Sequence, residues 1–401
     1  MVIKKLCCQI IELVKRKKKA LLCSLCNVAI LLVLSYFVNN RPLFTGEDLD
    51  QYAWMDWIKD KLGFAHDVNS NDALFINIAY DKQLLDKYDD YGMPIGNIEI
   101  TDRSKLLSLL KILHKTNSYK YIFLDIRFEK GYNVSDVDSA LFAEISSMKN
   151  IVIANHSDIE LADSSLLKKA AISDYYATIT KTNFTRYQYR CDSIESVPLY
   201  AYREITGNTI EKFGWFYTCD RKLCYNSMFV HFPVEKWDEY NEQQAKVFYN
   251  LGSDILDSYS EDDIRTLTKG KFIVIGDMVE DVHDTYSGLK PGSVITYYSF
   301  LELMKGRHFV KYGMIIFMAV LFFLISLSLF EAEPILMRFP FIKNSHSRIF
   351  HFLVDLVEYT LILALSMIIL YVVFGIATSI VLPSTYFAIQ KSIIQFKRLK
   401  V

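Results

Sequence analysis

Several carboxylates and an imidazole follow a short apolar run late in the chain. Residues 272–275 are apolar, the run stops at Gly276, and the loop behind it carries Asp277, Asp281, His283 and Asp284. Carboxylate and imidazole groups on one loop can bind a divalent cation or a polar ligand. The spacing does not match an EF-hand, so an acidic surface loop is the simpler interpretation. Because the loop follows an expected strand, we still predict that it borders any ligand pocket.

Polar residues end two other expected strands in the same way. Residues 119–126 form one strand, with Asp125 near its end and Arg127 behind it, and residues 150–154 form the next, followed by Asn155. Strand ends of a parallel sheet gather at one edge, so we predict a ligand-binding set of Asp125, Arg127 and Asn155 together with the acidic loop. Asp125 and Arg127 either form an ion pair, or Arg127 binds an anionic group of a ligand.

Enzyme signatures are absent from the sequence. It contains no G-x-S-x-G elbow, no G-x-G-x-x-G fingerprint and no P-loop pattern. We therefore expect no catalytic residues, no cofactor and no resident metal. The region that we place outside the membrane has no basic patch, which argues against a nucleic-acid partner.

The composition mixes a soluble domain with membrane helices. The chain is 51% hydrophobic and 23% charged, with a net charge of −1. We predict transmembrane helices at residues 20–38, 312–330, 351–373 and 376–394. The last one is short and is either a fourth span or a re-entrant or interfacial segment, and Gly375, Pro383 and Ser384 are candidates for a hairpin in this region. Basic residues at 15–19 and in the tail 395–401 place both ends in the cytoplasm. Residues 1–19 and the loop 331–350 are then cytoplasmic, and residues 39–311 form an extracytoplasmic domain.

Two acidic residues lie near the start of the third expected span. Asp355 and Glu358 are three residues apart and so share one helix face. Either they sit in the interface, where water solvates them, or they pair with a basic residue of a membrane partner.

The chain has seven cysteines, of which Cys219 and Cys224 flank a short segment in the outside region. In an oxidising compartment these two can close a small loop as a disulfide. Buried thiols are the other interpretation, and zinc is disfavoured because no histidine lies at ligand spacing.

Alternating strands and helices set the fold class. Expected strands at 73–79, 119–126, 150–154, 229–232 and 272–275 alternate with helices at 102–115, 139–148 and 196–206, and an amphipathic helix with Trp54 and Trp57 is expected over 44–65. This order predicts an α/β domain with a Rossmann-like, mostly parallel sheet. Transmembrane α-helices flank it, one before the domain and about three after it.

The order of these pieces resembles the CHASE2 family, the extracytoplasmic sensory domains of bacterial membrane receptors. The resemblance covers residues 45–330 and rests on the strand at 73–79, Asp102-Arg103 with its leucine helix, Phe123-Leu124-Asp125, the segment 138–154, the turn 250–256 and the closing signature 270–307. Two positions depart from the family pattern. Thr296-Tyr297 stands in place of its His-Ala pair, and the proline expected after Thr285 is Tyr286.

The resemblance implies a sensor in a bacterial inner membrane that detects a small-molecule or protein ligand outside the cytoplasm. The chain carries no recognisable output module, so we expect the signal to pass to a membrane or cytoplasmic partner in trans. A homodimer is compatible with this interpretation. The alternative is a structural or docking subunit of a cell-envelope complex. A cavity at the strand ends favours the sensor, and a flat aromatic surface favours docking.

Overall fold

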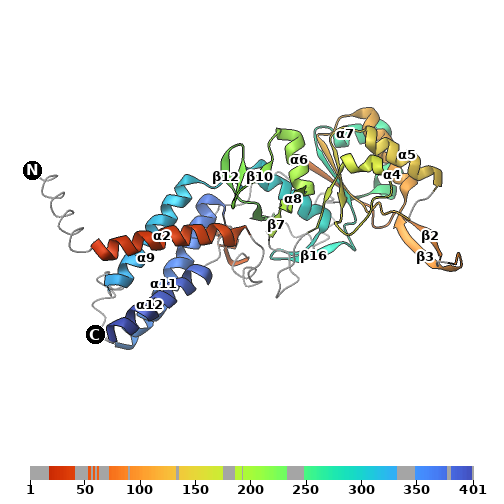
Figure 1. The fold of residues 1–401 in the computed structure, drawn as a ribbon. Helices are drawn as coiled ribbons and strands as arrows, with labels where there is room; N and C mark the ends of the chain where they lie inside the picture. Colours follow the sequence, from red (N-terminus) through yellow and green to blue (C-terminus); the bar gives the residue numbers. More distant parts are fainter. Residues whose placement is uncertain are drawn as a thin grey trace, which may run out of the picture. The chain divides into compact units, whose positions relative to one another are not determined.

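The protein was analysed as a computed structural model. The structure describes residues 18–40, 53–55, 57–58, 61–62, 72–88, 91–131, 135–174, 186–191, 193–232, 248–331, 348–376 and 381–399. The chain divides into two units, an α/β unit over Thr45–Phe309 and a helical unit that combines Met1–Phe44 with Val310–Val401. Figure 1 shows the elements of both units.

A six-stranded sheet forms the centre of the α/β unit, and all its strands run parallel. The strands, in spatial order, are β14 (Phe248–Asn250), β1 (Ala73–Asn77), β15 (Phe272–Gly276), β4 (Tyr121–Asp125), β5 (Ile151–Asn155) and β6 (Ala170–Ile172). The central strand β15 is buried along its whole length, as expected of a parallel strand covered on both faces. The mixed α/β class and the parallel sheet are therefore confirmed.

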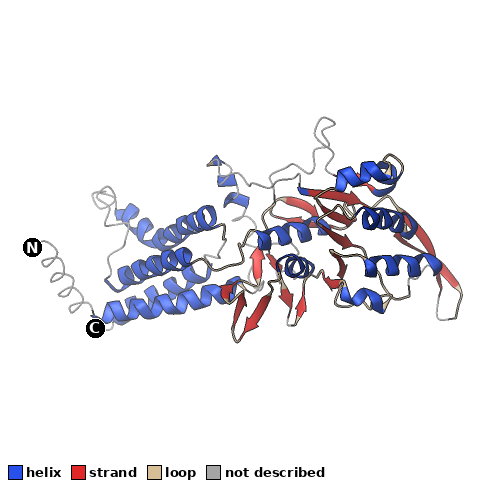
Figure 2. Ribbon diagram, turned by 90° about the horizontal axis from the view of Figure 1, so that it is seen from above, coloured by secondary structure: helices blue, strands red, loops and turns tan. Residues whose placement is uncertain are grey.

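Helices cover both faces of this sheet. The leucines and isoleucines of alternate strand positions pack against α4 (Arg103–Thr116), α5 (Ser135–Ser147) and α7 (Glu261–Thr268). The aromatic residues between them, such as Phe123 and Phe272, face α8 (Gly292–Met304), where they contact Phe300. Helix α6 (Val197–Thr206) packs beside α8. The strand period of two thus separates an aliphatic face from an aromatic one, and Figure 2 shows helices on both sides of the strands.

Asp102 and Arg103 stabilise the helices on the aliphatic face of the sheet. Asp102 caps α4 by accepting from the backbone N–H groups of Ser104 and Lys105. Arg103 is buried, forms an ion pair with Asp138 and lies over the rings of Phe128 and Phe142. The pair Asp102-Arg103 therefore begins the helix and also fastens it to α5.

Small antiparallel sheets surround this core, and the sequence did not predict them. They are β2 (Lys82–Tyr88) with β3 (Pro94–Thr101), β7 (Arg186–Gln188) with β13 (Ser227–Phe229), β8 (Arg190–Cys191) with β9 (Ile194–Glu195), β16 (Val282–Thr285) with β17 (Gly288–Pro291), and β10 (Ile210–Phe213) with β11 (Phe216–Cys219) and β12 (Lys222–Cys224). The predicted strand 229–232 is largely wrong, because the observed strand ends at Phe229. The predicted acidic loop instead contains the β16–β17 hairpin.

The helical unit contains α2 (Lys18–Asn39), α9 (Tyr312–Glu331), α11 (Arg348–Ile369) and α12 (Val381–Leu399). By length and composition, the described residues include two helices apolar enough to cross a bilayer, Lys18–Asn39 and Tyr312–Phe330. A π-helical turn, Leu370–Phe374, extends α11 and ends at Gly375, whose φ is 67°. The predicted break at Gly375 is confirmed, but Pro383 and Ser384 lie within α12 and do not mark a hairpin. Helix α12 starts and ends about five residues later than predicted. Most of the predicted amphipathic helix over 44–65 lies outside the described residues, although Trp54 and Trp57 are exposed.

Asn27 links three helices of this unit. Its side chain contacts the hydroxyl of Ser326 on α9 at 2.6 Å, the amide of Gln390 on α12 at 2.7 and 2.8 Å, and the hydroxyl of Tyr386 at 2.8 Å. Such polar contacts between apolar helices fix their relative rotation and height.

Candidate functional site

An open cleft of about 590 Å³ lies at the carboxyl ends of β4, β5 and β6, next to the beginning of α8. Its lining residues are Asp125, Arg127, His156, Ser157, Asp158, Ile159, Ser173, Asp174, Tyr187, Asp281, His283, Gly292, Ile295 and Thr296. This is the edge at which parallel α/β sheets bind ligands. Of the predicted ligand-binding residues, the cleft brings together Asp125, Arg127, Asp281 and His283.

Asp125 is an acidic group of the cleft whose pKa is strongly raised. It is the last residue of β4 and is partly buried. Burial and the nearby charge of Asp281 raise its pKa to about 7, against smaller opposing effects of His156 and His283. Its strand neighbour is Gly276, where an added Cβ would lie 3.2 Å from the Cβ of Asp125 and 2.8 Å from that of Ser293. The glycine therefore leaves room for the side chain of Ser293 and for the Cβ of Asp125.

Each cleft histidine has its own carboxylate. His156 Nδ1 lies 2.8 Å from Asp174 Oδ1, and Asp174 also accepts the backbone N–H of Ser157 at 3.0 Å. Burial opposes ionisation of Asp174, but these hydrogen bonds outweigh it and lower its pKa. His283 Nε2 lies 3.2 Å from Asp281 Oδ1. Two imidazole–carboxylate pairs thus share the cleft with Asp125.

The remaining predicted ligand-binding residues lie elsewhere. Asp277 forms an ion pair with Lys82 at 2.9 Å and accepts the backbone N–H groups of Val279 and Glu280, so it closes its own loop. Asn155 joins β5 to the chain after β6 through its carbonyl, which accepts from Ser173 at 2.7 Å. Neither Asn155 nor Asp284 lines the cleft, and strand alternation turns Asp284 away from the side of His283.

Arg127 lines the cleft but has a different partner from the one predicted. Its guanidinium contacts Glu129 Oε2 at 2.6 Å and forms no ion pair with Asp125. Both residues line the cleft, although β4 itself ends at Asp125. Arg127 is also mostly exposed.

The predicted disulfide between Cys219 and Cys224 is not formed in this structure, in which both residues are buried as thiols. Cys219 is paired across the hairpin with Lys222, and Cys224 with Tyr217. The two cysteines are therefore diagonal neighbours, whose Cα atoms lie about 7–8 Å apart in such a ladder. A disulfide requires about 4.4–6.8 Å.

Of the two acidic residues in the third predicted span, the structure describes the side chain of Glu358. Glu358 is fully buried inside the helical unit. A contact with a partner's basic residue requires the carboxylate to be accessible, so this conformation does not favour the predicted partner role for Glu358. The side chain of Asp355 lies outside the described part of the chain.

His156 and Asp174 are the residues that the sequence prediction missed. His156 directly follows the predicted Asn155, so its place at the strand end was visible, but its partner Asp174 comes after β6, a strand that was not predicted. Among the described residues, no group of three or more metal-ligand side chains has the geometry of a metal site. The cleft therefore contains the carboxyl group of Asp125, whose pKa is close to neutral pH, together with the carboxylates of Asp158, Asp174 and Asp281.

Comparison with protein-family models, with curated proteins and with solved structures finds no match to this chain.

Proposed function

We propose that this protein is a membrane-bound receptor whose α/β domain binds a small, positively charged ligand in the cleft. The observation that carries this proposal is the cleft itself, which lies at the ligand-binding edge of a parallel sheet and contains Asp125 with its raised pKa. In this proposal the helical unit spans a bacterial inner membrane, the α/β unit faces the extracytoplasmic side, and a separate effector receives the signal. The resemblance to CHASE2 domains supports the same interpretation.

The charge of the cleft favours a cation. Four carboxylates line it, from Asp125, Asp158, Asp174 and Asp281, against one guanidinium that Glu129 already binds. Burial disfavours the ionised form of Asp125. A cation bound near Asp125 would stabilise that form and lower its pKa. A ligand with a primary or secondary amine fits this chemistry better than an anionic ligand, which was one of the two alternatives for Arg127.

Helix α8 offers a route from the cleft to the membrane helices. Its first residue, Gly292, lines the cleft, and its last turns carry Glu302, which Arg307 binds at 2.8 Å. A helix of this length spans roughly 20 Å and moves as a rod. The chain then passes through Phe309 and enters α9 at Tyr312. A ligand that favours one position of α8 would therefore shift the segment that leads into α9.

The first test is calorimetric titration of the full-length protein in lipid nanodiscs with spermidine as the cationic probe. If the ligand binds the ionised carboxylate of Asp125, whose pKa is about 7, the affinity should rise by about tenfold in total as the pH increases from 6 to 8. The Asp125→Asn variant should bind more weakly and lose the pH dependence, whereas Asp284→Asn, outside the cleft, should bind normally. Binding of spermidine and of other small amines that is absent, or unchanged in Asp125→Asn, would contradict the proposal.

The alternative is a docking subunit of an envelope complex. The concave cleft favours the receptor, because docking surfaces are typically flatter. Mass spectrometry of proteins that co-purify from gently solubilised native membranes separates the two. A kinase, a cyclase or another signalling effector is expected, and recovery of envelope-machinery subunits alone would favour docking.

A further inference from the structure

A hairpin tip of the α/β unit presents three large aromatic side chains to solvent. The strands β10 and β11 are joined by the two-residue loop Gly214-Trp215, in which Gly214 has a φ of 60°, as the first position of a type II′ turn requires. The side chains of Phe213, Trp215 and Phe216 are 75%, 79% and 38% exposed. Adjacent exposed aromatic side chains on a short, tight turn mark an interaction surface.

The register of the sheet places this tip beside the segment that leads into α9. Cys224 forms an isolated antiparallel bridge with Phe309, and the backbone N–H of Tyr225 donates to the carbonyl of His308 at 2.7 Å. Cys224 is paired with Tyr217, which directly follows Phe216. The aromatic end of the hairpin and Phe309 are therefore separated by about two strand spacings, roughly 10 Å. Only Val310 and Lys311 separate Phe309 from α9, a path of at most about 11 Å.

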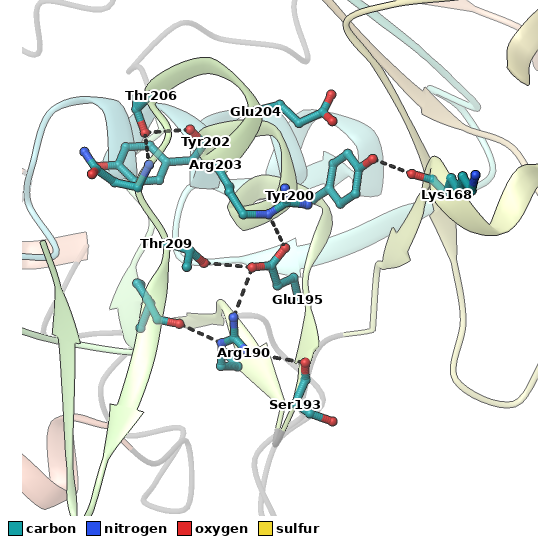
Figure 3. A network of polar contacts seen from close by, with 12 residues as sticks. Lys168, Arg190, Ser193, Glu195, Tyr200, Tyr202, Arg203, Glu204, Thr206 and Thr209 are labelled. Carbon is teal, nitrogen blue, oxygen red and sulfur yellow. Dashed lines mark hydrogen bonds and ion pairs between the residues drawn. The ribbon is translucent and has the colours of Figure 1, made fainter. Parts of the chain in front are cut away.

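The base of the hairpin is held firmly in the α/β unit, as Figure 3 shows. Glu195 binds Arg190 at 3.0 Å, Arg203 at 2.8 Å and the hydroxyl of Thr209 at 2.8 Å. Arg190 also donates from Nε to the carbonyl of Ile210, the first residue of β10, at 2.6 Å. This network anchors the start of β10, and with it the base of the hairpin, to α6 and the β8–β9 pair.

The charges of the β10–β12 sheet are nearly balanced. Next to the tip, Lys212 on β10 is accompanied by Glu211, and in the turn at the opposite end of β11, Arg221 and Lys222 are accompanied by Asp220, which lies 3.7 Å from Lys222. This arrangement gives little attraction to an acidic or a basic partner. Tryptophan and other aromatic side chains, in contrast, favour the boundary between lipid headgroups and hydrocarbon.

We infer that the Phe213–Phe216 tip inserts into the interfacial layer of the bilayer that α9 enters. The inference rests on the proposed function, because it requires the helical unit to span that bilayer. The tip then acts as a second attachment of the α/β unit to the membrane. It fixes the height of the unit above the lipid through the β12–Phe309 bridge.

Tryptophan quenching in nanodiscs of bromine-labelled phosphatidylcholine tests this inference. The full-length variant Trp54→Phe, Trp57→Phe, Trp237→Phe retains only Trp215. A matched control adds Trp215→Phe and Tyr91→Trp, which places the single tryptophan on the β2–β3 hairpin at a residue that is 91% exposed. We expect the brominated lipid to reduce Trp215 emission about twofold, with a blue shift, and to leave the control unchanged. In the natural background, Trp215→Phe should remove a matching share of the quenching.

The outcomes separate this inference from the proposed function. If the protein stays in the bilayer after alkaline carbonate but Trp215 is quenched only by aqueous acrylamide, the tip is in water and the inference fails. If neither quencher reaches Trp215, a protein surface covers it, and the inference also fails. If carbonate releases the protein from the bilayer, the membrane-spanning receptor proposal fails and the inference fails with it.

Discussion

Gly292 and Asp281 approach each other so closely that a Cβ on Gly292 would lie 2.5 Å from Asp281 Oδ2. The backbone N–H of Gly292 also donates to the Asp281 carbonyl at 2.9 Å. This contact packs the chain before β16 against the first residue of α8. It brings the Asp281 carboxylate to the positive end of a helix and, at the same time, close enough to Asp125 to raise its pKa.

The influence of Asp281 on Asp125 can be tested by removing one charge. In Asp281→Asn the negative charge disappears while burial remains, so the pKa of Asp125 should fall below about 7 by roughly half a pH unit. Titration of 13C-labelled aspartate carboxyl groups by NMR measures the pKa of Asp125 in both proteins. Asp284→Asn removes a charge from the same hairpin outside the cleft and should leave the pKa of Asp125 in place. Equal effects of the two variants would contradict a specific contact.

Asp125 should make stability depend on pH. Its pKa in the folded protein, about 7, lies above the ordinary value of 3.8, so folding favours the protonated form. Its favourable contribution is complete below pH 3.8 and is lost as the pH rises through 7. Asp125→Asn should therefore be more stable than the natural protein at pH 8, by on the order of 1 kcal/mol after allowance for partial exposure, and nearly equal at about pH 3.5. Thermal unfolding midpoints of both proteins at the two pH values measure this difference in stability, and a variant that is less stable than the natural protein at pH 8 would contradict the prediction.

Glu302 should produce the opposite pH dependence. Burial alone would raise its pKa, but His231 at 3.0 Å and Arg307 at 2.8 Å outweigh burial and lower the pKa to about 2. A depressed folded pKa stabilises the protein above pH 4.5, and this stability is lost as the pH falls from 4.5 toward 2. Glu302→Gln should cost about 3 kcal/mol at pH 7, because the positive charge of Arg307 then lacks its carboxylate.

Thermal midpoints between pH 7 and pH 3 check the prediction for Glu302. Glu211→Gln, on the exposed surface of β10, should shift the midpoint little. The natural protein should lose more stability than Glu302→Gln as the pH falls. Parallel pH curves for the two proteins would show that Glu302 does not carry this dependence.

The parts of the fold that were predictable are those with local signals. The leucine spacing of α4, the apolar run of β15 and the glycine at 375 each determine their element from neighbouring residues. The β16–β17 hairpin was missed because Val282 to Thr285 alternates too weakly to stand out from an acidic loop. Within the site, Asp125 and His283 follow from strand order, whereas the pairing of His156 with Asp174 depends on the short strand β6. The pairing of Arg127 with Glu129 involves residues beyond the end of β4, where the strand pattern no longer predicts which side chains meet.

The thiols of Cys219 and Cys224 should both react after unfolding. Because the two residues are diagonal across β11 and β12, a disulfide would require the hairpin to shift. Alkylation of the protein unfolded without reductant, followed by mass spectrometry of its peptides, should find both cysteines modified. A peptide pair joined through these two residues would overturn the assignment.

Asn27 should hold three helices of the helical unit together. Replacement by leucine removes its contacts with Ser326, Tyr386 and Gln390 and leaves those polar groups among apolar side chains. Asn27→Leu should therefore cost about 1–2 kcal/mol and lower the thermal midpoint in detergent. Ser24→Ala is the matched control, since Ser24 is buried in the same helix and its hydroxyl has no hydrogen-bond partner. It should be neutral or slightly stabilising, because it removes a buried, unsatisfied polar group. Equal midpoints for the two variants would mean that the network around Asn27 does not stabilise the helical unit.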